Sequence, residues 1–166
     1  MNHIDQINNT NQIDPTDLRV SDHFTVDAER TSMMMSMLKG RVFIVDDEEH
    51  VRKTVSLALK QGGYEVIEAA DGEEAIATIQ SYPTGFPVHA IICDIDLPKV
   101  NGKDLISFIR AKLPSVPVIV LTGHADVQSA ASLFKQGVVD YLIKPSHAQT
   151  VLDAVRRAIG EQTVFE

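Results

Sequence analysis

The chain has 166 residues, 44% of them hydrophobic, which suits one ordinary domain with a sizeable core but leaves little room for a second. Its formal net charge of -8 argues against a nucleic-acid-binding surface, which usually carries a basic stripe or patch. A single cysteine, Cys93, excludes an internal disulfide and a cysteine-based zinc site, so we expect a protein of the reducing cytoplasm.

Residues 1–39 are polar and show no clean hydrophobic periodicity, so we interpret them as a flexible extension. The alternative is a short helix that docks on the domain or a partner through an apolar face of Met33, Met34, Met35 and Met37. The start of the chain is not basic, and no apolar stretch approaches the length of a membrane span. We therefore expect neither a signal peptide nor membrane insertion.

From Gly40 onward, short apolar runs alternate with amphipathic segments of about a dozen residues, a pattern typical of βα units around a parallel sheet. The β-branched run Val116–Leu121 is what a strand buried on both faces requires. Strands are expected at Arg41–Val45, Tyr64–Ala69, Val88–Cys93, Pro117–Leu121 and Val139–Ile143. Helices are expected at Glu48–Gln61, Gly72–Ser81, Gly102–Lys112, Ala125–Gln136 and Ser146–Ile159.

This alternation predicts a doubly wound α/β domain over residues 40–162, in which five helices flank a five-stranded parallel sheet, with a short tail at residues 163–166. Two residue pairs have the spacing of a capping box and mark expected helix starts. These pairs are Asp71 with Glu74 and Ser146 with Gln149.

Polar side chains follow four of the five expected strands. Asp46 and Asp47 follow the first strand, Asp94 the third, Thr122 the fourth and Lys144 the fifth. The carboxyl ends of parallel strands meet at one edge of a doubly wound sheet, where ligands bind. Three converging carboxylates repel one another and raise one another's pKa unless a cation neutralises them, and Mg²⁺ is the natural candidate.

This set of residues is suited to phosphoryl transfer. Asp94 can attack phosphorus as a carboxylate nucleophile and form an acyl phosphate. Phosphoryl transfer requires mainly positioning and neutralisation of the phosphoryl oxygens, which Mg²⁺, the ammonium of Lys144 and the hydroxyl of Thr122 could supply. The sequence therefore predicts a magnesium-dependent phosphoacceptor site.

The segment from Gly40 to about Ile159 resembles the receiver domain of two-component response regulators, the CheY-like superfamily. The order and spacing of the matching motifs are highly specific, and the stretch Leu121–Val127 is similar to receivers of nitrogen-regulation and nodulation regulators. The motifs are Ile44-Val45-Asp46-Asp47, Ile92-Cys93-Asp94-Ile95-Asp96-Leu97-Pro98 with Asn101-Gly102, Val120-Leu121-Thr122-Gly123, and Asp140-Tyr141-Leu142-Ile143-Lys144-Pro145. The resemblance implies a flavodoxin-like sheet with strand order 2-1-3-4-5.

The resemblance also implies roles for the residues at the phosphoacceptor site. Asp94 corresponds to the phosphorylated aspartate, and Lys144 to the lysine that pairs with the phosphoryl oxygens. Asp47 is implied as a direct Mg²⁺ ligand and Asp46 as a ligand acting largely through water. The backbone carbonyl of Asp96 would complete the protein's share of the metal coordination.

A second group of residues is implied to sense the phosphoryl group and to set its lifetime. Thr122 and Tyr141 correspond to the switch pair, in which the hydroxyl turns toward the phosphoryl group and the aromatic ring fills the vacated space. Asp96 and His124 stand where the family tunes phosphoryl lifetime. Lys144-Pro145 is the place of a cis peptide, which only an X-Pro bond makes accessible.

A histidine kinase or a histidine phosphotransfer protein is the phosphoryl donor that the resemblance implies. No output domain is expected before the sequence ends at Glu166, so we expect a switch or relay that is not an enzyme for other substrates and that binds no nucleic acid. A downstream protein would contact the face formed by Ala125–Gln136, Val139–Ile143 and Ser146–Ile159, and phosphorylation-dependent homodimerisation is a further option. The alternative is the regulatory fragment of a longer transcription factor.

A phosphatase is the competing function from another class. Asp94-Ile95-Asp96 after a hydrophobic strand resembles the nucleophile motif of haloacid-dehalogenase-like phosphatases, in which Asp96 would be the general acid. In those enzymes a Thr or Val normally follows, and the metal-binding acids lie downstream of the nucleophile. Here Leu97-Pro98 follows and the acidic pair lies upstream, so we favour the receiver.

Overall fold

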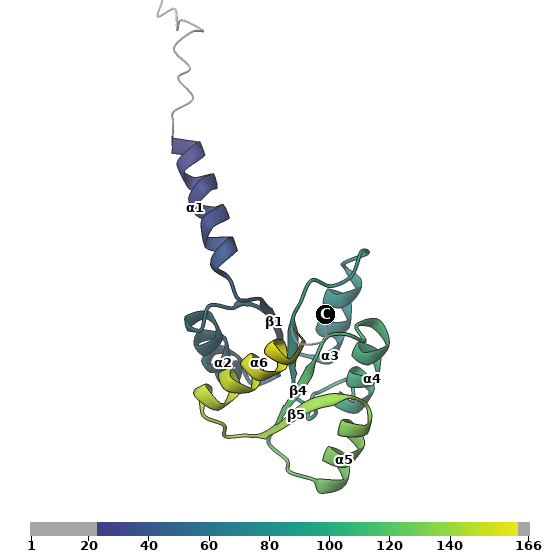
Figure 1. Ribbon diagram of the computed structural model, residues 1–166. Coiled ribbons are helices and arrows are strands. Elements are labelled where there is room, and N and C mark those ends of the chain that lie inside the picture. Colours follow the sequence, from purple (N-terminus) through teal and green to yellow (C-terminus); the bar gives the residue numbers. More distant parts are fainter. Residues whose placement is uncertain (1–22, 163–166) are drawn as a thin grey trace, which may run out of the picture. The chain divides into compact units, whose positions relative to one another are not determined.

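The chain divides into two units, Met1–Ser36 and Met37–Glu166, which are considered separately. The structure is a computed structural model that describes residues 23–162. Helix α1 (His23–Met37) is the described element of the first unit, shown in purple and blue in Figure 1. This helix lies in the segment for which we favoured a flexible chain over a short helix, and residues 23–37 are helical. The remainder of that expected extension up to residue 22, and the expected tail at 163–166, lie outside the described residues.

The second unit is built on five parallel strands in the order β2-β1-β3-β4-β5, as the resemblance implies. The strands are β1 (Arg41–Val45), β2 (Glu65–Ala69), β3 (Ala90–Cys93), β4 (Val118–Thr122) and β5 (Val138–Ile143). Every residue of the inner strands β3 and β4 is buried, as is every residue of the third inner strand, β1, except Arg41. This burial explains why their sequences are continuously apolar and do not alternate with polar residues.

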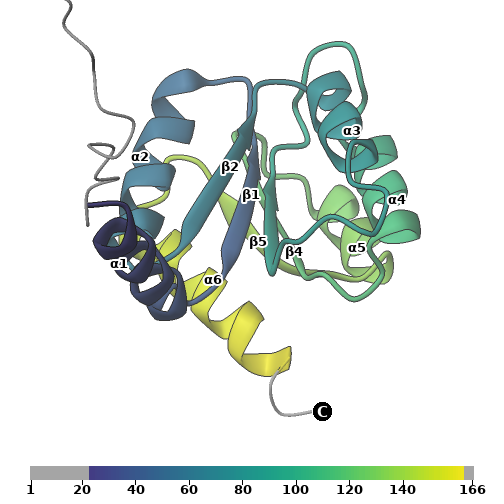
Figure 2. The same cartoon turned by 90° about the horizontal axis from the view of Figure 1, so that it is seen from above.

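Five helices flank the sheet, as expected, and α1 brings the described chain to six. They are α2 (Glu49–Gln61), α3 (Gly72–Gln80), α4 (Gly102–Lys112), α5 (Val127–Lys135) and α6 (Ala148–Gln162). Figure 2 shows α2 and α6 on one face of the sheet and α3, α4 and α5 on the other. No helix among residues 23–162 is long and apolar enough to cross a membrane.

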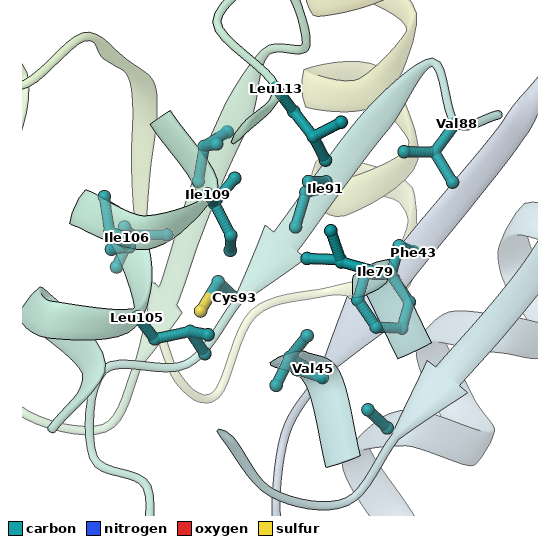
Figure 3. Packing of buried hydrophobic residues seen from close by; sticks show 14 of the residues in the cluster. Phe43, Val45, Ile79, Val88, Ile91, Cys93, Leu105, Ile106, Ile109 and Leu113 are labelled. Carbon is teal, nitrogen blue, oxygen red and sulfur yellow. The ribbon is translucent and has the colours of Figure 1, made fainter. Parts of the chain in front are cut away.

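The hydrophobic core is correspondingly split into two clusters, one on each face of the sheet. On the face covered by α3, α4 and α5, Leu105, Ile106 and Ile109 of α4 are fully buried near Ile91 and Cys93 of β3 (Figure 3). Their spacing places all three on one side of the helix. Cys93 is a buried strand residue, as expected, and burial raises the pKa of its thiol, so the thiol is protonated and unreactive.

One of the two expected capping boxes forms and the other does not. The carboxylate of Asp71 accepts a hydrogen bond from the backbone of Glu74 at 2.9 Å, and the Glu74 carboxylate accepts from the backbone N–H just before the cap. At the start of α6 the prediction is wrong, because the Ser146 hydroxyl donates to the carbonyl of Ile143 at 2.6 Å. The Gln149 amide donates to another side chain of α6. The helix starts after Ser146 and uses neither residue as expected.

The loop between β3 and α4 is held tightly against its neighbours. A methyl group on Gly102 would lie 2.2 Å from the Cα of Ile95, so only glycine allows this backbone approach. Lys99 has a positive φ of 68°, and its ammonium lies 2.9 Å from the carboxylate of Asp71. These contacts fix the loop that directly follows Asp94.

Candidate functional site

Backbone hydrogen bonds between neighbouring strands continue one residue past the strand ends and fix the polar residues there. The N–H groups of Asp46 and Asp94 donate to carbonyls at the ends of the adjacent strands, at 3.2 and 2.8 Å. The N–H of Lys144 donates to the carbonyl of Thr122 at 2.7 Å. The four residues therefore meet at the carboxyl edge of the sheet, as the sequence predicts.

Three carboxylates form an acidic cluster at this edge. Oxygens of Asp46, Asp47 and Asp94 all lie within 4.8 Å of one another. Asp46 and Asp94 are each 2% exposed, whereas Asp47 is exposed. Asp46 Oδ2 has an ion pair but no partner with hydrogen-bond geometry in the described part of the chain. Such a set of oxygen donors fits a hard divalent cation.

The electrostatics of Asp46 point in the same direction. Burial raises the pKa of Asp46, and the negative charge of Asp94 adds to the increase. The ion pair with Lys144 and the hydrogen bond from the backbone of Glu48 lower the pKa without cancelling the effect of burial. A cation in the cluster would stabilise the ionised form of Asp46.

Lys144 is the positive centre of the site. Its Nζ lies 2.6 Å from Asp94 Oδ2, 2.7 Å from Asp46 Oδ2 and 2.9 Å from Glu48 Oε1. Burial acts to lower the pKa of Lys144, but its close contacts with these three carboxylates raise the pKa above its ordinary value. The ammonium is therefore charged at neutral pH.

Glu48 is a site residue that the sequence analysis did not identify. Its position directly after the acidic pair was an available signal, and hydrogen bonding to Lys144 lowers the pKa of its carboxyl.

A second cluster surrounds Thr122, which is fully buried at the end of β4. The Thr122 hydroxyl donates to Asp96 Oδ2 at 2.7 Å, and His124 Nδ1 lies 2.9 Å from the same oxygen. The Tyr141 hydroxyl donates to the backbone carbonyl of His124 at 3.2 Å. The residues predicted as the switch pair and as lifetime-tuning positions thus form one hydrogen-bonded network.

The charges in this network stabilise one another. Partial burial acts to raise the pKa of Asp96, but hydrogen bonds from Thr122 and His124 bring it below its ordinary value. The bond to Asp96 raises the pKa of His124 in turn. Asp96 is also anchored to the first cluster, because its backbone N–H donates to Asp94 Oδ1 at 2.8 Å.

Comparison with known proteins identifies the family. The family model for the response regulator receiver domain matches residues 42–156 of the sequence. The chain belongs to the response-regulator receiver family. Matches in sequence include the response regulator FleR of Pseudomonas aeruginosa, 30% identical over 125 residues, and the DNA-binding transcriptional regulator NtrC of Salmonella typhimurium, 32% identical over 124 residues. Each of these alignments covers 75% of this chain and 26% of the relative, so the chain spans about a quarter of the relatives' length.

Solved structures show the same relationship. A CheY-like receiver domain protein from Methanospirillum hungatei matches with a TM-score of 0.71 and 28% identity, over 78% of this chain and 99% of that one. The chain is thus similar to a whole receiver domain and to the receiver portion of larger regulators. The match supports the receiver over the phosphatase that the sequence left as a competitor.

The receiver structure brings the expected residues together in two linked groups. Asp46, Asp47, Asp94 and Lys144 form the acidic site, and the second network lies beside it. The Lys144-Pro145 peptide is cis, as the resemblance implies. The carbonyl of Asp96 as a metal ligand remains a prediction.

Proposed function

We propose that this receiver accepts a phosphoryl group on the carboxylate of Asp94 from a phosphohistidine of a histidine kinase or a phosphotransfer protein. The observation that carries the proposal is the setting of Asp94, a buried carboxylate in an acidic cluster with an ammonium 2.6 Å from Oδ2. A carboxylate oxygen of Asp94 attacks phosphorus as the phosphorus–nitrogen bond of the donor breaks. The leaving imidazole takes up a proton, and Asp94 becomes an acyl phosphate.

We propose that Mg²⁺ is the cation of this site, held by Asp47 directly, Asp46 largely through water, Asp94 and the backbone carbonyl of Asp96. When bound, Mg²⁺ supplies positive charge against the phosphoryl oxygens. The carboxylates are already held in place for that charge, because Asp46 Oδ1 and Asp94 Oδ1 each accept a hydrogen bond from a backbone N–H. Lys144 adds a second positive charge. Its ammonium now pairs with Asp94 Oδ2 and can pair with a phosphoryl oxygen instead.

We propose that Thr122 and Tyr141 convert phosphorylation into a change of surface. Thr122 turns its hydroxyl toward the phosphoryl group, and the ring of Tyr141 then moves into the space left behind. The Tyr141 hydroxyl donates to the His124 carbonyl at 3.2 Å, a hydrogen bond that a rearrangement of the loop after β4 can break. Asp96 and His124, beside the phosphoryl position, set how long the acyl phosphate survives.

The proposed contact face for a downstream protein, or for a second copy, is formed by α5, β5 and α6. Three large apolar residues there are about half exposed, Phe134 at 48%, Val139 at 45% and Ile143 at 50%. Val139 and Ile143 lie in the strand that carries Tyr141, so a movement of that residue reaches the same surface. Lys135, Gln136 and Arg156 are the polar residues that we propose take part in this contact.

The remaining features of the proposed function follow from the family. We propose that residues 40–162 act in the cytoplasm as a signalling domain that catalyses only its own phosphorylation and dephosphorylation. The output is read by another protein, or by a further part of a longer regulator such as the relatives NtrC and FleR. Residues 1–39 and 163–166 would serve as an extension and a tail.

Phosphorylation in vitro tests the proposal. Incubation with acetyl phosphate and Mg²⁺ should add one phosphoryl group, detected as a mass increase or as hydroxylamine-labile label. Asp94→Asn should abolish labelling because the amide cannot form an acyl phosphate, whereas Asp104→Asn on the exposed side of α4 should label normally. Unchanged labelling of Asp94→Asn would show that the site has been wrongly assigned.

A further inference from the structure

We propose that the side chain of Asp96 is a latch that holds Thr122 in the unphosphorylated position, so that phosphorylation of Asp94 must compete with Asp96 for the Thr122 hydroxyl. The inference rests on the proposed function of Asp94. It adds a positioning role to a residue so far expected to supply a backbone ligand and to influence phosphoryl lifetime.

The hydroxyl proton of Thr122 is the basis of the competition. A threonine hydroxyl has one proton, and in this structure it is donated to Asp96 Oδ2 at 2.7 Å. Thr122 cannot donate to a phosphoryl oxygen while this bond is made. Because the acceptor is a carboxylate, the bond is charge-assisted and stronger than one to a neutral acceptor. Release of Thr122 therefore has a definite cost.

The latch is held in place from two directions. The backbone N–H of Asp96 donates to Asp94 Oδ1 at 2.8 Å, which ties the latch to the phosphoacceptor itself. His124 Nδ1 lies 2.9 Å from Asp96 Oδ2, so the carboxylate keeps a partner after Thr122 leaves. The Asp96 side chain, which is 42% exposed, thus keeps a charged or polar partner when Thr122 departs.

The same network connects the latch to Tyr141. The backbone N–H of His124 donates to the Thr122 hydroxyl at 3.3 Å, and its carbonyl accepts from the Tyr141 hydroxyl at 3.2 Å. Rotation of Thr122 removes the acceptor of the His124 N–H and perturbs the backbone that holds Tyr141. Asp96 therefore stabilises the resting positions of both switch residues.

A double-mutant cycle with beryllofluoride, a tetrahedral mimic of the phosphoryl group, tests the latch. Binding to the full chain is measured by titration calorimetry with Mg²⁺ saturating for each variant. Asp96→Ala should tighten beryllofluoride binding at least about five-fold, because Thr122 is no longer held. In the Thr122→Ala background, which has no hydroxyl to release, Asp96→Ala should change the affinity less than about two-fold.

Two further variants separate the latch from simple charge and from folding. Asp126→Asn removes one negative charge at the start of α5 while keeping a helix-capping side chain, and it should leave the affinity within about two-fold. Asp96→Asn keeps the shape of the side chain and a neutral acceptor, and it should give an intermediate tightening. It takes the place of Asp96→Ala if the truncated variant folds poorly.

Each outcome bears on the latch. The proposed latch is wrong if Asp96→Ala fails to tighten beryllofluoride binding. It is also wrong if Asp96→Ala tightens this binding equally with and without the Thr122 hydroxyl, since loss of charge alone would then be the cause. If the wild type shows no beryllofluoride binding that depends on Asp94, the proposed phosphoacceptor function fails, and the latch fails with it.

Discussion

Single residues in this site serve several partners at once. Lys144 contacts three carboxylates, of which Asp46 and Asp94 are buried, so its charge offsets a repulsion that the sheet edge creates. Buried ion pairs of this kind contribute little net stability, because desolvation offsets the attraction between the charges. Their value here lies in position, since an ammonium already lies where a phosphoryl oxygen would arrive.

Asp71 offers a prediction that depends on pH. The hydrogen bond from the Glu74 backbone, and then the bond from Lys99, lowers the pKa of Asp71 below its ordinary 3.8. A lowered pKa stabilises the fold above pH 3.8, and this stabilisation is lost as the pH falls through the pKa of the folded state. Asp71→Asn keeps a capping side chain but has no such charge. The difference in free energy of unfolding between wild type and Asp71→Asn should therefore be largest near neutral pH and shrink in acid.

Urea unfolding at a series of pH values measures this difference. Glu73→Gln is the matched control, because its carboxylate also faces Lys99, at 3.6 Å, but does not cap α3. Its effect should be smaller. If the difference in free energy of unfolding between wild type and Asp71→Asn stays constant from pH 7 to acid, the charge of Asp71 does not stabilise the fold as proposed.

Some site residues could be predicted from the sequence and others could not, for a physical reason. Asp46, Asp94 and Lys144 come directly after strands and Thr122 ends one, and the topology of a parallel sheet brings strand ends together whatever the side chains do. The bond between Thr122 and Asp96 depends instead on one side-chain rotamer and on the path of an irregular loop. Only the three-dimensional structure reveals such a contact.

At the level of elements, hydrophobic patterning predicted all five strands and the five helices around them, but their ends shift by a few residues. The start of α6 is the instructive case, because Ser146 has the right spacing for a cap and uses its hydroxyl within the preceding loop instead. Local spacing cannot show which of two backbone groups a short side chain will choose. The positive φ of Lys99 could not be predicted from local sequence either, since no glycine stands there.

The junction of the β3–α4 loop with α4 gives a prediction at this scale. Gly102→Ala should destabilise the second unit by about 2 kcal/mol, because the new methyl group would meet backbone atoms of Ile95 that cannot move independently. It should also weaken phosphorylation, since Ile95 directly follows Asp94.

Gly160→Ala in α6 is the control for the loss of a glycine. A methyl group there meets nothing within 4 Å, so this variant should be neutral or more stable by about 0.5 kcal/mol. Chemical denaturation of both variants measures the effect. Equal stability of the Gly102 variant and the wild type would show that the loop is looser than the structure indicates.

In the second unit as a whole, the parts that fold the chain are separate from the parts that carry chemistry. The two hydrophobic clusters lie on the faces of the sheet, whereas the acidic cluster lies at the carboxyl edge. Neither hydrophobic cluster uses a carboxylate, so neither requires a metal ion to form. The fold can therefore accept charge rearrangement at its edge without losing its core.

This separation predicts how the protein responds to Mg²⁺. Chelation should leave the far-ultraviolet circular dichroism and a cooperative thermal transition intact, because the cores remain packed. Mg²⁺ at 100 times its Kd should then stabilise the folded state by about 2.7 kcal/mol through binding alone. Asp47→Asn should lose most of this stabilisation, since it replaces an exposed carboxylate of the cluster with a neutral amide while leaving Asp46, Asp94 and Lys144 in contact. Asp104→Asn, the same change outside the cluster, should retain it. Thermal unfolding with and without Mg²⁺ distinguishes these cases, and a chelated protein that unfolds would mean that the acidic edge takes part in holding the fold together.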